Sequence, residues 1–203
     1  MTQTSSKPRG RDAQRMETRQ RIYDAAVAEY RRTGMADADI AVIVQEAGVA
    51  RGTFYFHFPT KEHVLAEVES NLVTRLAADL TRFLAAPRTL EATFGEVVRL
   101  VVAGESRLGA RLFHDVLAMH FSATRPPEWG KATDHPLVAL VAGEIARART
   151  EGLVHDDVQP VHSALYFLLG VYALLITNHE PKPVRARVIR DFVVHTQRGL
   201  AAR

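Results

Sequence analysis

The sequence has little that would support catalysis, metal binding or membrane insertion. It contains no cysteine among its 203 residues, which excludes disulfides and thiolate metal ligands. Its longest apolar run, residues 164–177, has 14 residues, fewer than the roughly 20 that a membrane-spanning helix needs. The N-terminus is polar and basic, without the apolar stretch of a signal peptide. We therefore expect a cytoplasmic protein with no membrane segment.

The chain also lacks the short motifs of common enzymes. No P-loop, GxGxxG, GxSxG or HExxH pattern occurs, and no paired carboxylates stand out. His114, Asp115 and His120 do not have the i, i+4 spacing that places two metal ligands on one helical face. The other histidines are scattered. We therefore predict a protein that is not an enzyme and that needs neither a metal ion nor another cofactor.

Positive charge is concentrated at the start of the chain. The formal net charge is only +3, but residues 1–32 contain eight basic side chains against four acidic ones. Residues 1–14 also contain serine, proline and glycine, and we predict a disordered basic arm there. Such an arm could follow DNA phosphates or enter a minor groove. A solvated tail without a role is an equal alternative.

Residues 39–49 have the local signals of a short helix and a tight turn. Asp39 can cap a helix over Ile40–Ala47, whose apolar side chains recur at the i, i+3, i+4 spacing of one buried face. Gly48 can adopt the positive φ of a sharp turn. Val49 follows as an apolar side chain that can fill the space before the next helix.

A second short helix is predicted over Arg51–Phe58, with Phe54 and Phe58 four residues apart on its inner face. The remaining side chains include donors for phosphate oxygens, an arginine that can reach a base edge, and a glycine that lets the backbone approach DNA. A pair of aromatic-rich core helices is the alternative, and it explains the two inner phenylalanines but not the polar residues. We predict DNA contacts from Arg51, Gly52, Thr53, Tyr55, Phe56, His57 and the nearby Lys61.

This stretch resembles the helix-turn-helix of the TetR family of bacterial regulators. The family pattern is present as Ile43-Val44, Ala47-Gly48-Val49-Ala50, Arg51, the run from Gly52 to Phe58, and Lys61. The clear resemblance covers about residues 19–65. Two departures are notable: Ala50 replaces a serine that would cap the second helix, and Val44 replaces a small alanine where helices pack.

The rest of the sequence has helical patterning, without strand signals or internal repeats. In the first predicted helix, Ile22, Ala26 and Tyr30 face inward. Thr60 can cap the helix that begins at residue 61. Asp156 and Asp157 can begin the helix that ends near residue 178. A loop containing Trp129 is predicted over residues 122–135. Helices are expected over residues 12 or 15 to 33, 40–47, 51–58, 61–85, 89–104, 111–121, 136–151, 156–178 and 184–201. We predict an all-α fold in which residues 15–60 form a three-helix DNA-binding domain and residues 61–203 form a six-helix domain for ligand binding and dimerisation.

The resemblance implies a homodimer and a palindromic double-stranded DNA operator. The last two helices, residues 158–178 and 184–201, would pair with those of a second copy as a four-helix bundle. The first of them is apolar nearly all round, and its small residues Ala164, Gly170 and Ala173 would permit close packing against the partner. The alternative is a central core helix in a monomer.

The resemblance also implies that the six C-terminal helices enclose a small-molecule effector whose binding releases DNA. Aromatic side chains with a few polar groups suit an apolar or aromatic effector, although each is alternatively plain core. The candidates are Phe83, Phe94, Arg107, Phe113, His114, Met119, His120, Phe121, Trp129, Tyr166 and Phe167. Two alternatives stay open: a DNA-binding regulator controlled by a protein partner without an inducer, and a helical small-molecule-binding protein or enzyme with a vestigial helix-turn-helix.

Overall fold

The computed structural model describes residues 9–123, 134–178 and 180–202. Within this part of the chain the named elements are all helices, as the sequence predicts: α1 (Arg9–Thr33), α2 (Ile40–Ala47), α3 (Arg51–His57), α4 (Lys61–Phe83), α5 (Leu90–Leu108), α6 (Ala110–Met119), α7 (Pro136–Thr150), α8 (Pro160–Thr177) and α9 (Lys182–Leu200).

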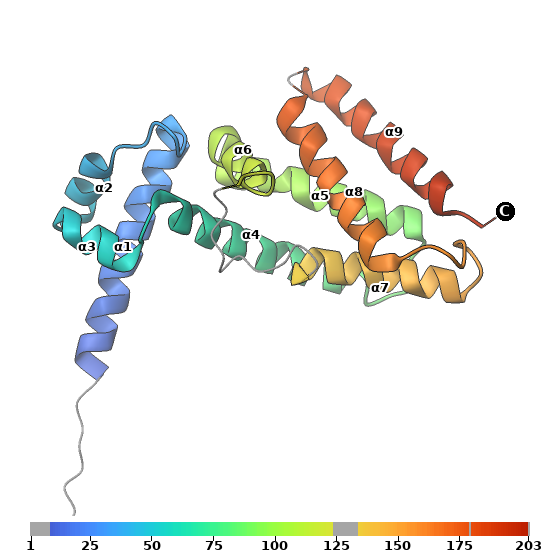
Figure 1. Cartoon of the computed structure of the whole chain (residues 1–203), viewed down its shortest axis with the longest axis horizontal. Coiled ribbons are helices and arrows are strands. Elements are labelled where there is room, and N and C mark those ends of the chain that lie inside the picture. Colours follow the sequence, from blue (N-terminus) through green and yellow to red (C-terminus); the bar gives the residue numbers. More distant parts are fainter. Residues whose placement is uncertain (1–8, 124–133, 179, 203) are drawn as a thin grey trace, which may run out of the picture.

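The helices form two groups that α4 connects. We call α1–α3 the head and α4–α9 the body. Figure 1 shows the head at one end of the long α4, with α5, α6 and α7 packed against that helix and α8 and α9 beyond them. Within the body, α7 packs extensively against α8, and α5 contacts α4, α6, α7 and α9. A change in the position of α4 therefore acts on both groups.

Apolar side chains at helical spacing explain the packing of the head. Ile22, Ala26 and Tyr30 on α1 are all fully buried, as predicted, and they face α2 and α4. The Tyr30 hydroxyl donates to the Lys61 carbonyl oxygen over 3.2 Å, which satisfies a polar atom at the start of α4. Fully burying one such large side chain contributes about 1.5–3 kcal/mol.

Two helix starts differ from the sequence prediction. α1 begins at Arg9, so residues 9–14 are helical rather than part of a disordered arm; residues 1–8 of that arm lie outside the described part. α8 begins at Pro160, not at Asp156 or Asp157, which lie in a turn. Proline suits the first turn of a helix, where its missing N–H costs nothing, so Pro160 defines this boundary more strongly than the acidic pair does.

The other helix ends fall within a few residues of their predicted places. The helix predicted to end near Gly104 continues to Leu108, and the following one ends at Met119 rather than Phe121. Thr60 occupies the N-cap position of α4, but its side chain makes no capping bond; the hydroxyl instead lies 3.0 Å from His63 Nδ1. The predicted loop that contains Trp129 lies mostly in residues 124–133, outside the described residues.

α8 leaves much of its apolar surface uncovered in a single chain. By length and composition alone it could cross a membrane, with a mean hydropathy of 1.6, and a third of its residues are buried. This is weak evidence for a membrane span, since a core or interface helix has the same composition. Val161 and Tyr166 on this helix are 41% and 67% exposed. The burial of α8 on two sides that the sequence predicts is therefore incomplete within a single chain.

Two small residues of α8 serve the chain itself rather than a partner. Ala164 is fully buried in the core. A Cβ atom on Gly170 would collide with the ring of Phe192, so the missing side chain is what allows α9 to approach α8. The prediction that these two positions admit a partner helix was wrong, because intrachain packing already uses them. Ala173 is half-buried.

Candidate nucleic-acid interface

The turn between α2 and α3 has the geometry that its sequence predicts. The Asp39 side chain accepts a hydrogen bond of 2.7 Å from Ala41 N and caps α2. Gly48 has a φ of +64°, the left-handed conformation that glycine adopts without strain. The Val49 N–H then donates to Val44 O over 3.0 Å, which closes the helix end. These local bonds fix where α3 starts and which way it points.

The two faces of α3 separate as predicted. Phe54 and the C-cap residue Phe58 are 0% and 1% exposed, and their ring centroids lie 6.1 Å apart. On the opposite side Phe56 is 68% exposed and Tyr55 is 42% exposed. The predicted contact residues Arg51 and Gly52 are exposed, whereas Thr53 and His57 are half-buried. The structure thus gathers six of the seven predicted contact residues on or beside one solvent-facing surface of α3.

Lys61 has a different environment. Its ammonium group donates to the carbonyl oxygens of Ala36 and Ala38 over 2.8 and 3.3 Å, and so ties the start of α4 to the loop between α1 and α2. Sequence reasoning assigned it a phosphate contact and missed this structural role. A lysine has three donors, and the loop uses two of them.

Arginines of α1 extend the positive surface beside α3. The Arg15 guanidinium lies 5.4 Å from the Phe56 ring centroid, and that of Arg19 lies 4.3 Å from the Phe58 centroid. Arg19 also donates to Glu67 of α4 over 2.7 Å. Burial, followed by the positive charges of these two arginines, lowers the pKa of His57. The lowered pKa favours the neutral imidazole, which can both donate and accept a hydrogen bond. Sequence reasoning missed both arginines, although their i, i+4 spacing on α1 could have indicated them.

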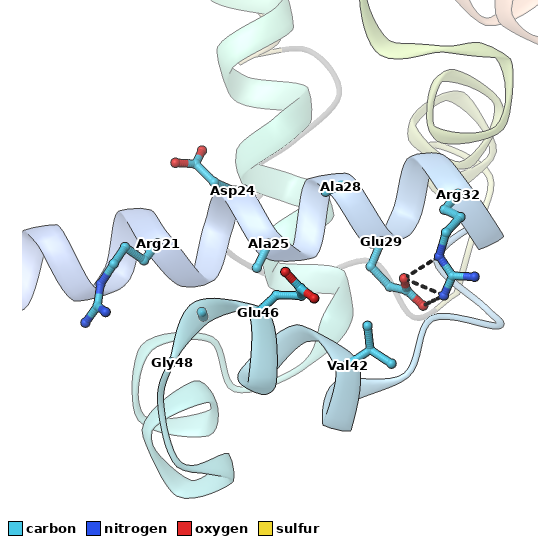
Figure 2. Close-up of a pocket in the computed structure, with 10 residues that line it drawn as sticks. Arg21, Asp24, Ala25, Ala28, Glu29, Arg32, Val42, Glu46 and Gly48 are labelled. Atoms are coloured by element: carbon cyan, nitrogen blue, oxygen red, sulfur yellow. Dashed lines mark hydrogen bonds and ion pairs between the residues drawn. The ribbon is translucent and has the colours of Figure 1, made fainter.

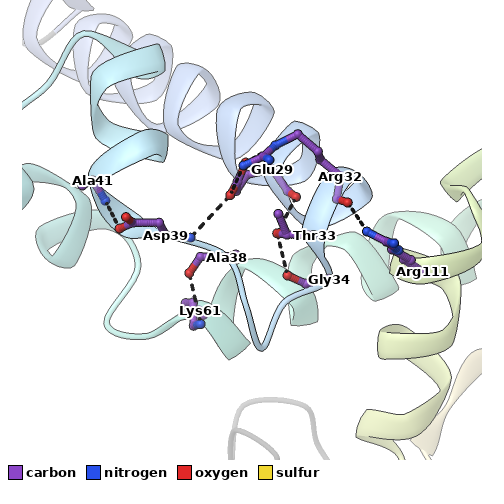
Figure 3. A network of polar contacts seen from close by, with 9 residues as sticks. All are labelled: Glu29, Arg32, Thr33, Gly34, Ala38, Asp39, Ala41, Lys61 and Arg111. Carbon is purple, nitrogen blue, oxygen red and sulfur yellow. Dashed lines mark hydrogen bonds and ion pairs between the residues drawn. The ribbon is translucent and has the colours of Figure 1, made fainter.

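A charged network secures the other end of α1 (Figure 3). Glu29, only 5% exposed, accepts from Nε and Nη2 of Arg32 over 2.7–3.0 Å. Its Oε1 atom also lies 3.5 Å from Asp39 N, next to the cap of α2. From the body, Arg111 donates to the Arg32 carbonyl oxygen.

Further bonds connect the head to α6 and the end of α5. Met35 N donates to Asp115 Oδ2 over 2.7 Å. The Arg31 guanidinium donates to the carbonyl oxygens of Leu108 and Arg107 over 3.1 and 3.2 Å. Together with the Arg111 bond these contacts form what we call the head–body joint. The joint therefore connects α6 directly to the end of α1.

A groove of about 590 Å³ lies in the head between α1 and α2 (Figure 2). Side chains of both signs line it, including Arg21, Asp24 and Glu46. None of its lining residues belongs to α3. A groove with this mixed charge does not suit an apolar ligand, and it lies away from the exposed face of α3.

The apolar residues predicted to line an effector pocket fall into different environments. Phe94 and Phe167 are buried and stack on each other with centroids 4.4 Å apart. Phe113 and Met119 are also buried. By contrast, Phe121 and Tyr166 are 50% and 67% exposed and do not line an interior pocket of the single chain. Phe83 is half-buried beneath the Arg88 guanidinium, and Trp129 lies outside the described residues.

The three polar residues predicted to line the effector pocket also lie in different environments. Arg107 is exposed and lies 3.7 Å from Asp79. His114 is exposed, with its Nε2 atom 3.3 Å from the Ile176 carbonyl oxygen. His120 instead lies inside the body, where its ring centroid is 4.8 Å from that of Tyr172. Burial, and then the charge of Glu69, raise the pKa of the Tyr172 hydroxyl far above its ordinary value.

The structure brings together three potential metal ligands that the sequence did not connect. Glu69 of α4, His120 at the end of α6 and His135 at the start of α7 place their ligand atoms within 4.8 Å of one another. The sequence predicted no metal site because it was searched for ligands at helical spacing. These three residues come from separate elements, so no local pattern could have revealed them.

Comparison with known proteins identifies the family. Residues 22–68 match the family described as bacterial regulatory proteins, tetR family. Two curated relatives from Pseudomonas putida, the HTH-type transcriptional regulator SrpR and the uncharacterised HTH-type transcriptional regulator TtgW, are each 37% identical over 95 residues. These matches cover 47% of this chain, 45% of SrpR and 71% of TtgW. The chain thus matches less than half the length of SrpR.

Solved structures share the whole architecture. Thermus thermophilus FadR, a TetR family transcriptional repressor in complex with lauroyl-CoA, has a TM-score of 0.67 at 24% identity and matches over 89% of this chain and 91% of that chain. The ketosteroid transcriptional regulator KstR2 of Mycobacterium tuberculosis has a TM-score of 0.60 at 13% identity. That match covers 91% of this chain and 95% of KstR2. At these identities the likeness concerns the fold. Taken with the helix-turn-helix geometry and the match to TtgW, it shows that the chain belongs to the TetR family of bacterial regulatory proteins, which are helix-turn-helix transcriptional regulators.

Proposed function

We propose that the protein is a cytoplasmic homodimeric repressor that binds a palindromic operator through α3 and leaves it when a small molecule binds the body. The observation that carries this proposal is the exposed face of α3. A face that combines a phenylalanine 68% exposed with arginines and hydroxyl donors suits a helix that enters a major groove.

The roles on α3 follow from side-chain chemistry. Arg51, exposed at the first position of the helix, reaches base edges and can pair with guanine O6 and N7. Thr53 and Tyr55 donate to phosphate oxygens, which position the helix without reading sequence. Gly52 lets the backbone come close, and Phe56 contacts a thymine methyl group or a sugar. Arg15 on α1 adds positive charge beside this face.

The uncovered surface of α8 supports the homodimer. Val161 and Tyr166 on α8 and Val184 on α9 are all more than 40% exposed. A second copy packed on α8 and α9 would bury these side chains in a four-helix bundle. Two copies of α3 can then read successive major grooves about 34–36 Å apart, which is why a palindrome is the expected operator.

The head–body joint supports control by an effector. A ligand that binds the body better in one arrangement of α4 and α6 shifts the population toward that arrangement. Because Arg111 and Asp115 bond directly to the head, the shift changes the position of α1 and α3. FadR was solved with lauroyl-CoA and KstR2 is named for ketosteroids, so we propose an apolar effector for this chain. The aromatic core around Phe94 and Phe167 suits that chemistry.

Selection of DNA from a random library, followed by titration by fluorescence anisotropy, tests the proposal. We expect a palindromic consensus whose affinity falls steeply with salt. Arg51→Ala should lose about 1–3 kcal/mol and relax base preference at one position of each half-site. Tyr55→Phe should weaken binding to all sequences alike. Arg75→Ala, an exposed α4 variant with the same charge change, is the control and should bind as the wild type does.

The outcomes separate the alternatives. If Arg51→Ala and Tyr55→Phe both leave operator affinity unchanged, α3 is not the reading helix. If no sequence preference appears but a small molecule binds, the chain is a carrier or an enzyme with a vestigial helix-turn-helix. If a specific operator is bound and neither lauroyl-CoA nor a steroid panel releases it, control by a protein partner becomes the better account.

A further inference from the structure

We propose that Glu69, His120 and His135 form a binding site for Zn²⁺, and that the bound ion sets the position of the head. The first half of this proposal concerns the body alone. The second half rests on the proposed function, because it concerns DNA affinity.

The spacing of the three side chains fits one metal ion. Oε1 of Glu69 lies 3.2 Å from Nε2 of His135 and 3.6 Å from Nε2 of His120. Ligand atoms about 2.1 Å from a tetrahedral zinc ion are about 3.4 Å apart. The two distances lie on either side of this value, and all three ligand atoms lie within 4.8 Å of one another, so the two histidine rings would move toward a shared ion on binding.

The proton positions suit metal binding at His120. Its Nδ1 atom lies 3.2 Å from the Val116 carbonyl oxygen, and since a carbonyl only accepts, Nδ1 must carry the proton in this bond. In a neutral ring Nε2 then presents its lone pair toward Glu69. An imidazole whose Nδ1–H donates to a backbone carbonyl is the usual form of a histidine ligand, because the carbonyl fixes both tautomer and ring orientation.

His135 must exchange one bond to join the site. Its Nδ1 atom accepts from Leu137 N over 3.3 Å, so Nε2 carries the proton and donates to Glu69. Coordination through Nε2 moves that proton to Nδ1, and the capping bond to Leu137 is lost.

Burial and donor type select the class of ion. The side chains of Glu69, His120 and His135 are 4%, 9% and 12% exposed. Two imidazoles and one carboxylate suit zinc and similar first-row ions rather than Mg²⁺ or Ca²⁺, which prefer oxygen ligands alone. Three protein ligands leave a fourth position for water. A groove of about 470 Å³, lined by both Glu69 and His135, gives solvent a route to that position.

The site lies where a bound ion can influence the head. Glu69 belongs to α4, which connects the two parts of the molecule. His120 ends α6, the helix whose other residues Arg111 and Asp115 bond to the head. An ion that holds these residues to His135 fixes α4 and α6 relative to α7. It thereby restricts the movement that the head–body joint transmits.

Binding is tested with the untagged full chain, first stripped with a chelator. Cobalt serves as the spectroscopic substitute for zinc. We expect about one Co²⁺ per chain, a visible absorption typical of tetrahedral nitrogen and oxygen ligation, displacement by Zn²⁺, and a Zn²⁺-dependent rise in Tm. Glu69→Gln and His120→Gln should each weaken binding by more than about 100-fold, since even outer-shell changes cost 10–100-fold. His114→Gln, an exposed histidine on the same helix, should bind as the wild type does.

Two results would overturn the site. One is the absence of the cobalt absorption and of any Zn²⁺-dependent change in Tm. That result would mean that Glu69, His120 and His135 are joined by hydrogen bonds and do not bind a metal ion. The other is equal binding by the wild type and by both cluster variants. Because a buried Glu69→Gln change could unfold the chain, His120→Gln and circular dichroism of each variant keep the test decisive.

The regulatory half has a separate measurement. Operator affinity should change at least fivefold between zinc-loaded and stripped wild type, and not in His120→Gln. If the zinc-loaded and stripped proteins bind the operator equally while cobalt still binds, the metal site exists but does not regulate DNA binding. A chain that binds cobalt but no specific DNA refutes the proposed function instead.

Discussion

The aromatic side chains of α3 divide sharply by exposure, and that division carries functional meaning. Phe54 and Phe58 are buried in the head, where each contributes a few kcal/mol of apolar transfer. Phe56, only two residues from each, is 68% exposed, and it meets the Arg15 guanidinium. A phenylalanine this exposed leaves most of its apolar surface unburied in the free protein, so most of its apolar transfer free energy is not used there. Its contribution is therefore available for binding.

Ala50 is the residue at which α3 is weakest. It occupies the N-cap with φ −75° and ψ 153°, the extended conformation of a capping residue, but it has no side-chain oxygen to accept a helix N–H. Ala50→Ser should supply that acceptor and raise the free energy of unfolding by about 1 kcal/mol. Urea denaturation followed by circular dichroism measures the change.

Ala78→Ser is the matched control for this substitution. Ala78 is exposed in the interior of α4, where serine is a poorer helix former than alanine. The free energy of unfolding of the Ala78→Ser variant should fall by a few tenths of a kcal/mol. Equal effects of the two substitutions would mean that the N-terminus of α3 is already satisfied by water and gains nothing from a cap.

At the scale of the element, two glycines near α3 have opposite roles. Gly48 turns the chain with a φ of +64°, whereas Gly52 lies inside the helix with nothing within 4 Å of a Cβ placed on it. Gly48→Ala should lower the free energy of unfolding by about 1–2 kcal/mol, the cost of a left-handed alanine. Gly52→Ala should raise it by up to about 1 kcal/mol, because alanine is the better helix former.

DNA binding gives the second measurement on this pair. If the backbone of α3 approaches DNA at Gly52, the added methyl group should weaken operator binding about tenfold or more, which is about 1.4 kcal/mol. A more stable protein with poorer DNA affinity is the expected result for Gly52→Ala. Gain of stability with unchanged affinity would place the DNA contact elsewhere on the helix.

The elements that sequence reasoning located best are those specified by their own residues. α2, its turn and α3 follow from a capping aspartate, a left-handed glycine and apolar spacing, all within twenty residues. The start of α8 was predicted too early, because both Asp156 and Pro160 are residues that favour a helix start and the structure begins the helix at Pro160. The bond between His135 and Glu69 joins residues 66 positions apart. Such a contact is created by packing of α4 against α7, and no local pattern encodes it.

At the scale of the whole molecule, α8 and α9 determine whether the protein can read a palindrome. In one chain, α8 buries Phe167 and Leu168 but exposes Tyr166 and, in its first turn, Val161. A helix of this composition gains most when both sides are covered. In the proposed homodimer a second copy covers this exposed surface and two heads bind one DNA duplex, so we expect stability and operator recognition to depend on the same interface.

Tyr166→Glu tests this dependence. A carboxylate in the centre of an apolar interface would lose its hydration without gaining a partner, a cost of several kcal/mol. We expect a monomer by sedimentation velocity and a loss of operator affinity of about 100-fold or more, since linkage of two binding modules contributes 10²–10⁴. Affinity for a single half-site should be unchanged, because α3 lies in the head.

Ala139→Glu is the matched control, because Ala139 is exposed on α7 and does not belong to α8 or α9. This variant should remain dimeric and bind the palindrome as the wild type does. A Tyr166→Glu protein that is still dimeric with full operator affinity would refute the α8–α9 interface. A variant that forms a normal dimer but does not bind the palindrome would show instead that Tyr166 affects the spacing of the two heads rather than their association.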